Sequence, residues 1–167
     1  MTVITKLCAV LAAGLLGATA ASAGSDDPRT VQWRASRAHD PFNGGVLAVA
    51  EVSFDGAKAM VRCASRADRL EIRFFLDEAL VAGADTVTWR FDAEEQRSGR
   101  WRRSPNGHSL IVPASLHDTF IDDLETYDTI HLSLAGGDGG AQHLMLPLRG
   151  SADAIDRALG WCAGTAG

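Results

Sequence analysis

The chain has 167 residues and a formal net charge of −5 at pH 7, with 16 Lys and Arg against 21 Asp and Glu. This mildly acidic balance argues against non-specific nucleic-acid binding, which needs a basic surface. After Lys6 the positive charge is nearly all arginine, since Lys58 is the only other lysine.

Residues 1–23 have the pattern of a secretory signal peptide. Lys6 precedes an apolar run of small residues, and Ala21-Ser22-Ala23 fits the small-x-small pattern of a cleavage site. The apolar run has about 15 residues, short of the roughly 20 that a membrane-spanning helix needs. We therefore expect cleavage near Gly24, a periplasmic or secreted protein, and no stable membrane anchor.

The remainder of the chain has the length of one domain with a real core and is too short for two. Residues 24–30 are polar and contain Pro28, so we predict a flexible leader there. We predict a single domain over residues 31–163.

Short segments of alternating apolar and polar residues follow one another from residue 31 onward. Turn signals separate several of them, including Asn43-Gly44-Gly45, Asp55-Gly56 and Asn106-Gly107. Residues 77–85 fit a helical turn, a short strand or a loop. Strands are predicted over residues 31–38, 46–54, 57–64, 70–76, 86–92, 96–104, 108–112, 129–134 and 141–148.

Two segments have the periodicity of amphipathic helices. In the first, near 115–125, apolar residues recur at steps of four and Ser115 is the expected N-cap. In the second, near 151–161, Ser151 is the expected N-cap and Cys162 lies on the apolar stripe. With the many short strands, this pattern predicts a mainly β fold: an antiparallel β-sandwich carrying a short helix and a C-terminal helix.

Two cysteines follow the signal peptide, Cys63 and Cys162. In an exported chain, a lone pair of cysteines indicates a disulfide. Because Cys63 shares the inward face of its strand with Ala59 and Val61, the bridge would staple the last helix onto the sheet. It would close a loop of about 100 residues, worth roughly 4–5 kcal/mol in the chain-entropy model. A two-cysteine metal site is the alternative, but no histidine stands at zinc-motif spacing.

The sequence contains no catalytic motif. It has no Gly-x-Ser-x-Gly, and the adjacent pair His117-Asp118 would point about 100° apart on a helix. Gly136–Gly140 lacks the helix and lysine that follow a phosphate-binding loop. We therefore predict a protein that is not an enzyme and that needs no cofactor.

His131 and His143 are weak candidates for metal ligands. Both fall on the outward face of the last predicted hairpin, as direct or diagonal cross-strand neighbours. No third ligand is visible in the sequence, so we predict no metal site, and exposed, unpaired histidines are the simpler interpretation.

Residues 86–104 hold two predicted strands, each with one tryptophan. Alternation places Trp89 and Trp101 on core faces, and it places Arg90 with Asp92 on a polar face as an ion pair or cross-strand brace. Arginines crowd the second strand. A docking surface for an acidic partner, a phospholipid headgroup or a cell-wall polymer is one interpretation, and a solvated edge strand is the other. The candidate binding residues are Arg90, Asp92, Arg97, Arg100 and Arg102.

Several short motifs, taken in order, resemble the VasI/TagO family of type VI secretion-associated periplasmic proteins. The resemblance covers Trp33–Cys162, the core domain, and lacks the N-terminal segment with its own cysteine pair. It implies an accessory or binding protein without catalytic residues, whose partner is an envelope or secretion-system protein. The motifs are Trp33-x-x-Ser36, Asp40-Pro41, Val61-Arg62-Cys63, Trp89-Arg90-Phe91-Asp92, Trp101-x-x-Ser104, and Leu146-Pro147-Leu148-x-Gly150 before the helix that ends at Cys162.

The leading hypothesis is therefore an exported, non-catalytic binding protein, associated with type VI secretion or envelope assembly. A small secreted inhibitor of a cell-wall hydrolase is the second hypothesis. The third is a hydrolase whose turnover depends on particular histidines or on carboxylates from the acidic clusters. Those clusters are Asp92 with Glu94 and Glu95, and Asp122-Asp123 with Glu125.

Overall fold

The computed structural model describes residues 27–42, 44–66, 69–77, 79–80, 86–135 and 141–164. The predicted signal peptide and its cleavage site lie outside these residues. So do residues 24–26 of the predicted leader, the glycine-rich turn 136–140 and most of the ambiguous segment 77–85.

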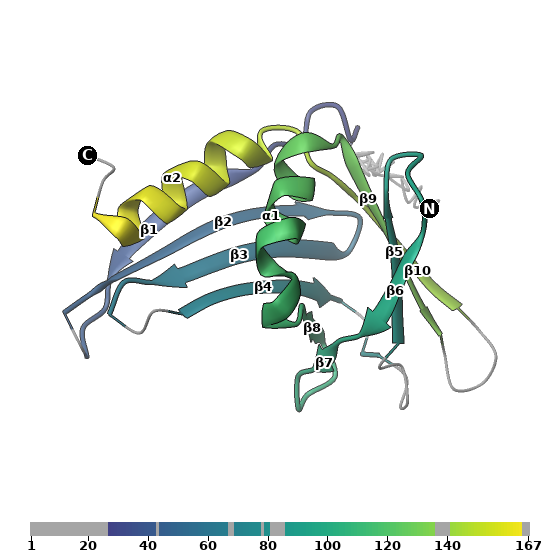
Figure 1. Cartoon of the computed structure of the whole chain (residues 1–167), viewed down its shortest axis with the longest axis horizontal. Coiled ribbons are helices and arrows are strands. Elements are labelled where there is room, and N and C mark those ends of the chain that lie inside the picture. Colours follow the sequence, from purple (N-terminus) through teal and green to yellow (C-terminus); the bar gives the residue numbers. More distant parts are fainter. Residues whose placement is uncertain are drawn as a thin grey trace, which may run out of the picture.

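The described residues form two antiparallel sheets (Figure 1). The large sheet has the strand order β1-β2-β3-β4-β8-β7, and the small sheet has the order β10-β9-β5-β6. The predicted mainly β fold with two antiparallel sheets is confirmed. The large sheet comprises β1 (Arg34–His39), β2 (Val46–Phe54), β3 (Ala57–Ala64), β4 (Arg69–Leu76), β7 (Arg102–Arg103) and β8 (Ser109–Ile111). The small sheet comprises β5 (Thr86–Phe91), β6 (Arg97–Arg100), β9 (Thr129–Ala135) and β10 (Ala141–Pro147).

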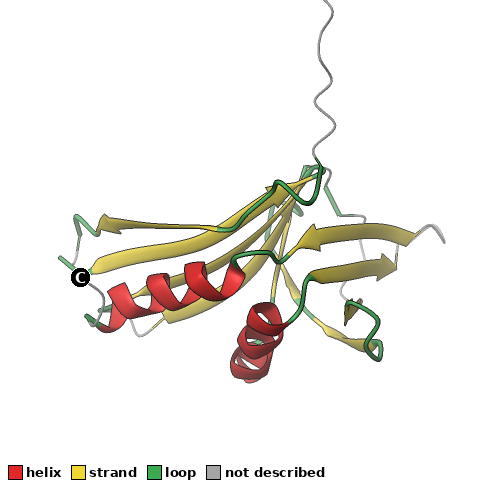
Figure 2. Cartoon of the chain, turned by 90° about the horizontal axis from the view of Figure 1, so that it is seen from above, coloured by secondary structure: helices red, strands yellow, loops and turns green. Residues whose placement is uncertain are grey.

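Both predicted helices are present and lie on the same side of the large sheet (Figure 2). Helix α1 (His117–Thr126) follows a 3₁₀ turn, η1 (Ala114–Leu116), and α2 (Ser151–Ala163) runs along β1, β2 and β3. We call the face of the large sheet that carries the helices its inner face, and the opposite face its outer face.

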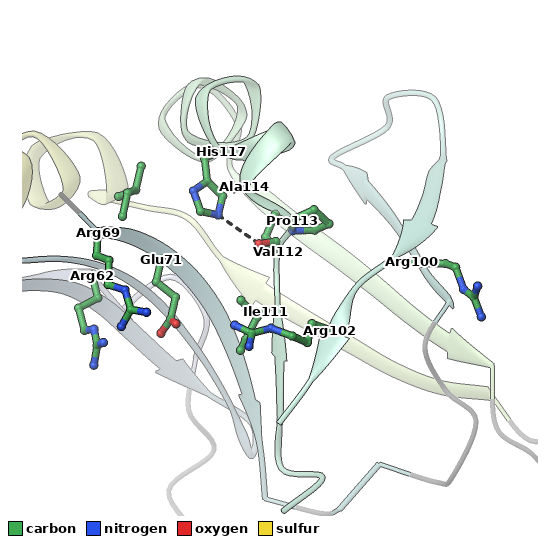
Figure 3. Close-up of a pocket in the computed structure, with 11 residues that line it drawn as sticks. Arg62, Arg69, Glu71, Arg100, Arg102, Ile111, Val112, Pro113, Ala114 and His117 are labelled. Carbon is green, nitrogen blue, oxygen red and sulfur yellow. Dashed lines mark hydrogen bonds between the residues drawn. The ribbon is translucent and has the colours of Figure 1, made fainter. Parts of the chain in front are cut away.

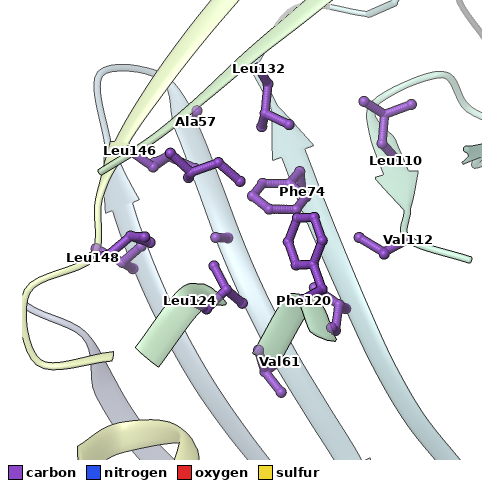
Figure 4. Close-up of a cluster of buried hydrophobic side chains, with 14 of the residues drawn as sticks. Ala57, Val61, Phe74, Leu110, Val112, Phe120, Leu124, Leu132, Leu146 and Leu148 are labelled. Carbon is purple, nitrogen blue, oxygen red and sulfur yellow. The ribbon is translucent and has the colours of Figure 1, made fainter. Parts of the chain in front are cut away.

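One hydrophobic cluster joins the two sheets and the two helices (Figure 4). Its centre is Phe120 of α1, whose ring centroid lies 5.4–6.2 Å from those of four aromatic residues. One of the four comes from the large sheet, two come from β5 of the small sheet, and one lies between the sheets. Helix α1 therefore packs over the space between the two sheets, with the Phe120 ring in contact with both. The four are Phe74, Trp89, Phe91 and Trp101.

The predicted disulfide is confirmed. Cys63 of β3 and Cys162 of α2 are bonded, with a Cα–Cα distance of 6.2 Å and a sequence separation of 99 residues. Because Cys63 faces inward on the sheet and α2 packs on that face, the bridge attaches the C-terminal helix to the centre of the large sheet.

The single strand predicted over residues 96–104 is wrong, because the chain changes sheet within it. β6 pairs with β5 in the small sheet, whereas β7 pairs with β8 in the large sheet. Trp101 lies between them, and only 2% of it is exposed. Its ring packs against Trp89 of one sheet and Phe74 of the other, with ring centroids 5.2 and 5.6 Å apart, respectively. Burying this side chain between the sheets requires the crossing.

The predicted serine N-caps are also wrong. Ser115 lies inside η1, where the backbone bond from Leu116 N to Pro113 O already begins the turn, so α1 starts without a side-chain cap. Ser151 is buried, and its hydroxyl donates to the carbonyl oxygen of Leu124 at 2.5 Å. It therefore ties α2 to α1 and leaves its own helix end uncapped.

Candidate functional site

A pocket of about 480 Å³ opens where β4 separates from β8, next to the turn that leads into α1 (Figure 3). Four of its lining residues are arginines and one is an acid, Glu71. We call this site the arginine pocket. Its arginines are Arg62, Arg69, Arg100 and Arg102, and its apolar lining includes Leu70, Ile111, Val112, Pro113 and Ala114.

The strand register brings Arg62, Arg69, Arg102 and Glu71 together on the outer face of the large sheet. Arg62 of β3 pairs with Glu71 of β4, while Arg73 of β4 and Arg102 of β7 both pair with Ile111 of β8. Directly paired residues share a face. Arg62 and Arg102 thus lie on the same face of the sheet, although they are 40 residues apart in the sequence.

Figure 3 shows how the labelled side chains divide. Arg62 and Arg69 lie on one wall, Arg102 lies on the other, and Glu71 stands between them. Arg100 extends away from the other three. The core of the pocket is therefore Arg62, Arg69 and Arg102.

The arginines of the pocket have no carboxylate partner within the described residues. Glu71 pairs with its own strand neighbour: its Oε1 lies 2.9 Å from Nη2 of Arg73. This contact compensates the two charges but is not aligned as a hydrogen bond, because Glu71 Oε1 and Arg73 Nε are both buried without one. Within the part of the chain that the structure describes, Arg62, Arg69 and Arg102 form no ion pair.

The gap beside β4 has a clear structural origin. The last hydrogen bond between β4 and the chain that continues β8 runs from Val112 N to Ile72 O, at 3.0 Å. Pro113 follows, and Ala114, the residue that would lie opposite Leu70 if β8 continued, begins η1 instead. Buried His117 then binds the carbonyl oxygen of Val112 through Nε2, at 3.1 Å. The first residues of β4 are thereby left without a neighbour on that side.

This arrangement suits binding. Guanidinium groups bind carboxylates and phosphates through paired, charge-assisted hydrogen bonds. The residues that line the pocket include no serine, threonine or cysteine, and its one histidine is bonded to a backbone carbonyl. The pocket thus offers an anion several donors above an apolar floor.

The other candidate residues lie elsewhere. Arg90 and the two candidate metal ligands line a second pocket, of about 340 Å³, on the small sheet. His131 pairs with Met145, two residues from His143, so the histidines are diagonal neighbours, as one of the predicted arrangements has it. Burial lowers the pKa of His131, the charge of Arg90 lowers it further, and Asp92 opposes them. Among the described residues, no three His, Cys, Asp or Glu side chains are arranged to hold a metal ion.

The predicted ion pair between Arg90 and Asp92 does not form within the described residues. Asp92 instead accepts hydrogen bonds at the start of β9, from the backbone N–H of Asp128 at 3.0 Å and that of Thr129 at 2.8 Å. The Thr129 hydroxyl donates to it as well, at 2.7 Å. Burial alone would raise the pKa of Asp92, but these three hydrogen bonds outweigh it, and the pKa is lowered. Asp92 is therefore a brace between β5 and β9.

Arg97 also has a structural contact. Its Nη1 lies 2.6 Å from Oδ2 of Asp123, so it ties β6 to α1. Of the five candidate binding residues, only Arg100 and Arg102 line the arginine pocket.

Sequence reasoning missed Arg62 and Arg69 as site residues. The signal was present, because alternation in β3 and β4 places Arg62, Arg69, Glu71 and Arg73 on one polar face. What the sequence did not indicate was that β7 and β8 would bring Arg102 to the same face.

No helix within the described residues is long and apolar enough to cross a membrane. No protein-family model matches the chain, and comparisons with the curated proteins and with solved structures found no match.

Proposed function

We propose that this protein is an exported, non-catalytic binding protein whose arginine pocket holds an acidic group of a partner. The observation that carries the proposal is the set of three arginines, Arg62, Arg69 and Arg102, around one pocket with no carboxylate partner among the described residues. Glu71 lies between these arginines but is paired with Arg73, so the pocket keeps an excess of positive charge and is suited to an anionic ligand.

An oxidising compartment is supported by the Cys63–Cys162 bridge, since stable disulfides are typical of exported proteins. The pattern of residues 1–23 favours export, to the periplasm or beyond it. The resemblance to the VasI/TagO family favours a partner in a type VI secretion system or in envelope assembly. These supports are independent of the pocket.

The proposal is tested by affinity capture from periplasmic extract, with the purified exported protein as bait. The double variant Arg62→Ser/Arg102→Ser removes two positive charges from the pocket. The control Arg34→Ser/Arg157→Ser removes two from exposed positions that do not line it. We expect the pocket variant to lose a partner that the wild type and the control retain.

Equal capture by all three proteins would overturn the pocket as the binding site. If the captured partner is a cell-wall hydrolase whose activity falls in the complex, the protein is an inhibitor and assembly is the wrong role. Trp101 is unsuitable for such a test, because it is buried in the core and its replacement would disturb the fold.

A further inference from the structure

The arginine pocket borders an open strand edge, that of β4 at Leu70. Three backbone hydrogen bonds establish toward which neighbouring strand the N–H and C=O of each β4 residue point. Asp77 N donates to Gly56 O, which is in line with β3, whereas Leu76 N donates to His108 O and Val112 N donates to Ile72 O, both on the side of β8. In an antiparallel pair, hydrogen-bonding residues alternate with non-bonding ones. The backbone N–H and C=O groups of Ile72 and Leu76 therefore point toward β8. The residues opposite them on β3 form no hydrogen bonds with them.

The same alternation applies two residues earlier, at Leu70. The register between β3 and β4 is continuous from Ala57–Leu76 to Ala64–Arg69, with no bulge to reverse the pattern. Ser65 N bonds to Val46 O, which places the bonds of Cys63, the residue opposite Leu70, on the β2 side. The N–H and C=O of Leu70 consequently point to the side of β8, where the β4–β8 ladder has already ended at Ile72.

No described residue occupies the place beside Leu70 where β8 would continue. Leu70 itself lines the arginine pocket, together with Val112, Pro113 and Ala114 from the segment that turns away. His117 binds the carbonyl oxygen of Val112, and Ala114, which would lie opposite Leu70, is part of η1, so this segment does not close back onto β4. The unpaired backbone N–H and C=O of Leu70 are therefore available to pair with another extended strand.

We propose that the arginine pocket takes an extended acidic peptide segment of the partner, which pairs with Leu70 as a short added strand beside β4. The inference rests on the proposed function and names the chemistry of its partner. The added segment occupies the line of β8 beyond Val112, with one hydrogen-bonded residue pair at Leu70.

The geometry also specifies the sequence pattern of the ligand. Side chains of an added strand alternate between the two faces of the sheet, and those on one face are about 6.6–6.8 Å apart. On the outer face they meet Arg62, Arg69 and Arg102. On the inner face they meet the side of Leu70 and Val112. We therefore expect acidic residues at every second position, with apolar residues between them.

A peptide fits this site better than a phosphate or a lipid headgroup. Arginines alone would hold any of these anions, but the free N–H and C=O of Leu70 match only a ligand that carries both an acceptor and a donor. The apolar lining suits intervening aliphatic side chains and offers a phosphate nothing.

The test is a binding titration of the purified protein, by calorimetry or fluorescence anisotropy, against three probes. The first is a seven-residue peptide of alternating glutamate and valine. The second has the same composition with its glutamates consecutive, and the third is inorganic tripolyphosphate. Each backbone nitrogen of the alternating peptide is then methylated in turn, which removes one N–H and leaves the protein unchanged.

We expect the alternating peptide to bind more tightly than the consecutive one. A single N-methylation, at the residue that pairs with Leu70, should weaken binding by about fivefold to tenfold, the effect of one hydrogen bond. The variant Arg62→Ser/Arg102→Ser should weaken it at least as much, and the control Arg34→Ser/Arg157→Ser should not.

The possible failures are distinguishable. If tripolyphosphate or either peptide binds and depends on Arg62 and Arg102, but no N-methylation matters, the pocket is a charge site and the added strand is overturned while the proposed function stands. If none of the three probes binds, or if the pocket variant binds them as the wild type does, both proposals are overturned.

Discussion

The ring centroids of Trp89 and Trp101 lie 5.2 Å apart. Trp89 belongs to β5 of the small sheet, whereas Trp101 immediately precedes β7 of the large sheet. Both Nε1 atoms are buried without a hydrogen-bond partner among the described residues. Leaving a buried donor unpaired has a cost, so packing must supply the gain that keeps the pair in place. The crossing between the sheets is therefore held by aromatic contact.

Trp101→Ala should lower the free energy of unfolding by about 3–5 kcal/mol, as removal of a large buried ring does. Trp101→Phe should lower it less, because it keeps most of the contact and removes the unpaired N–H. Urea unfolding followed by circular dichroism measures both. Equal stability of wild type and Trp101→Ala would contradict the role of this ring in joining the sheets.

Cys63→Ala/Cys162→Ala should lower the free energy of unfolding by roughly 2–5 kcal/mol, because the bridge restricts a long loop of the unfolded chain. The loss should match that seen when the wild type unfolds under reducing conditions. Mass spectrometry of the unreduced protein is the control, since it must show the two cysteines joined. Two free thiols in protein purified without reductant would contradict the disulfide.

Asp92→Asn tests the brace between β5 and β9. The lowered pKa of Asp92 means that the folded state favours the carboxylate, so its stabilisation is present above the ordinary aspartate pKa and is lost as the pH falls through the folded value. At neutral pH we expect a loss on the order of 1 kcal/mol, since hydrogen bonds to the carboxylate weaken. Asparagine tolerates the left-handed backbone of this residue, with φ of 44°.

The discriminating measurement for Asp92 is urea unfolding at neutral pH and below about pH 4, the ordinary aspartate range. The difference in stability between wild type and variant should shrink at the lower pH. A difference that is the same at both values would show that the carboxylate charge has no part in the brace.

Glu125→Gln tests an unfavourable charge between the two helices. Burial raises the pKa of Glu125, and the neighbouring carboxylates of Asp156 and Asp122 raise it further. A raised carboxyl pKa means that the ionised group destabilises the fold, so stability falls as the pH rises through the folded value. The variant should therefore be more stable than the wild type at neutral pH, by up to about 1 kcal/mol.

Glu94→Gln is the matched control for Glu125, because Glu94 is exposed in the turn after β5. It should leave the free energy of unfolding unchanged both at neutral pH and in acid. The advantage of Glu125→Gln should disappear in acid, where the wild-type carboxyl is protonated. A Glu125→Gln variant less stable than wild type at neutral pH would contradict the assignment.

The sequence by itself determined the local elements and the covalent link. Alternation with a period of two is a local property, so β2, β3, β4 and β5 were predictable to within a residue or two. The apolar spacing near Phe120 and Ile155 likewise predicted α1 and α2. Two cysteines on inward faces have only one way to pair within the chain, which is why the bridge was predictable.

Only the tertiary structure decided which strands meet. Arg100 and Arg102 have the same alternation whether the strand continues or crosses at Trp101, so no local pattern separates them into two sheets. The crossing follows from the long-range burial of Trp101 between Trp89 and Phe74. That same crossing carries Arg102 to β8, and hence to the open edge of β4 where the arginine pocket forms. The site is long-range because the contacts that build it are.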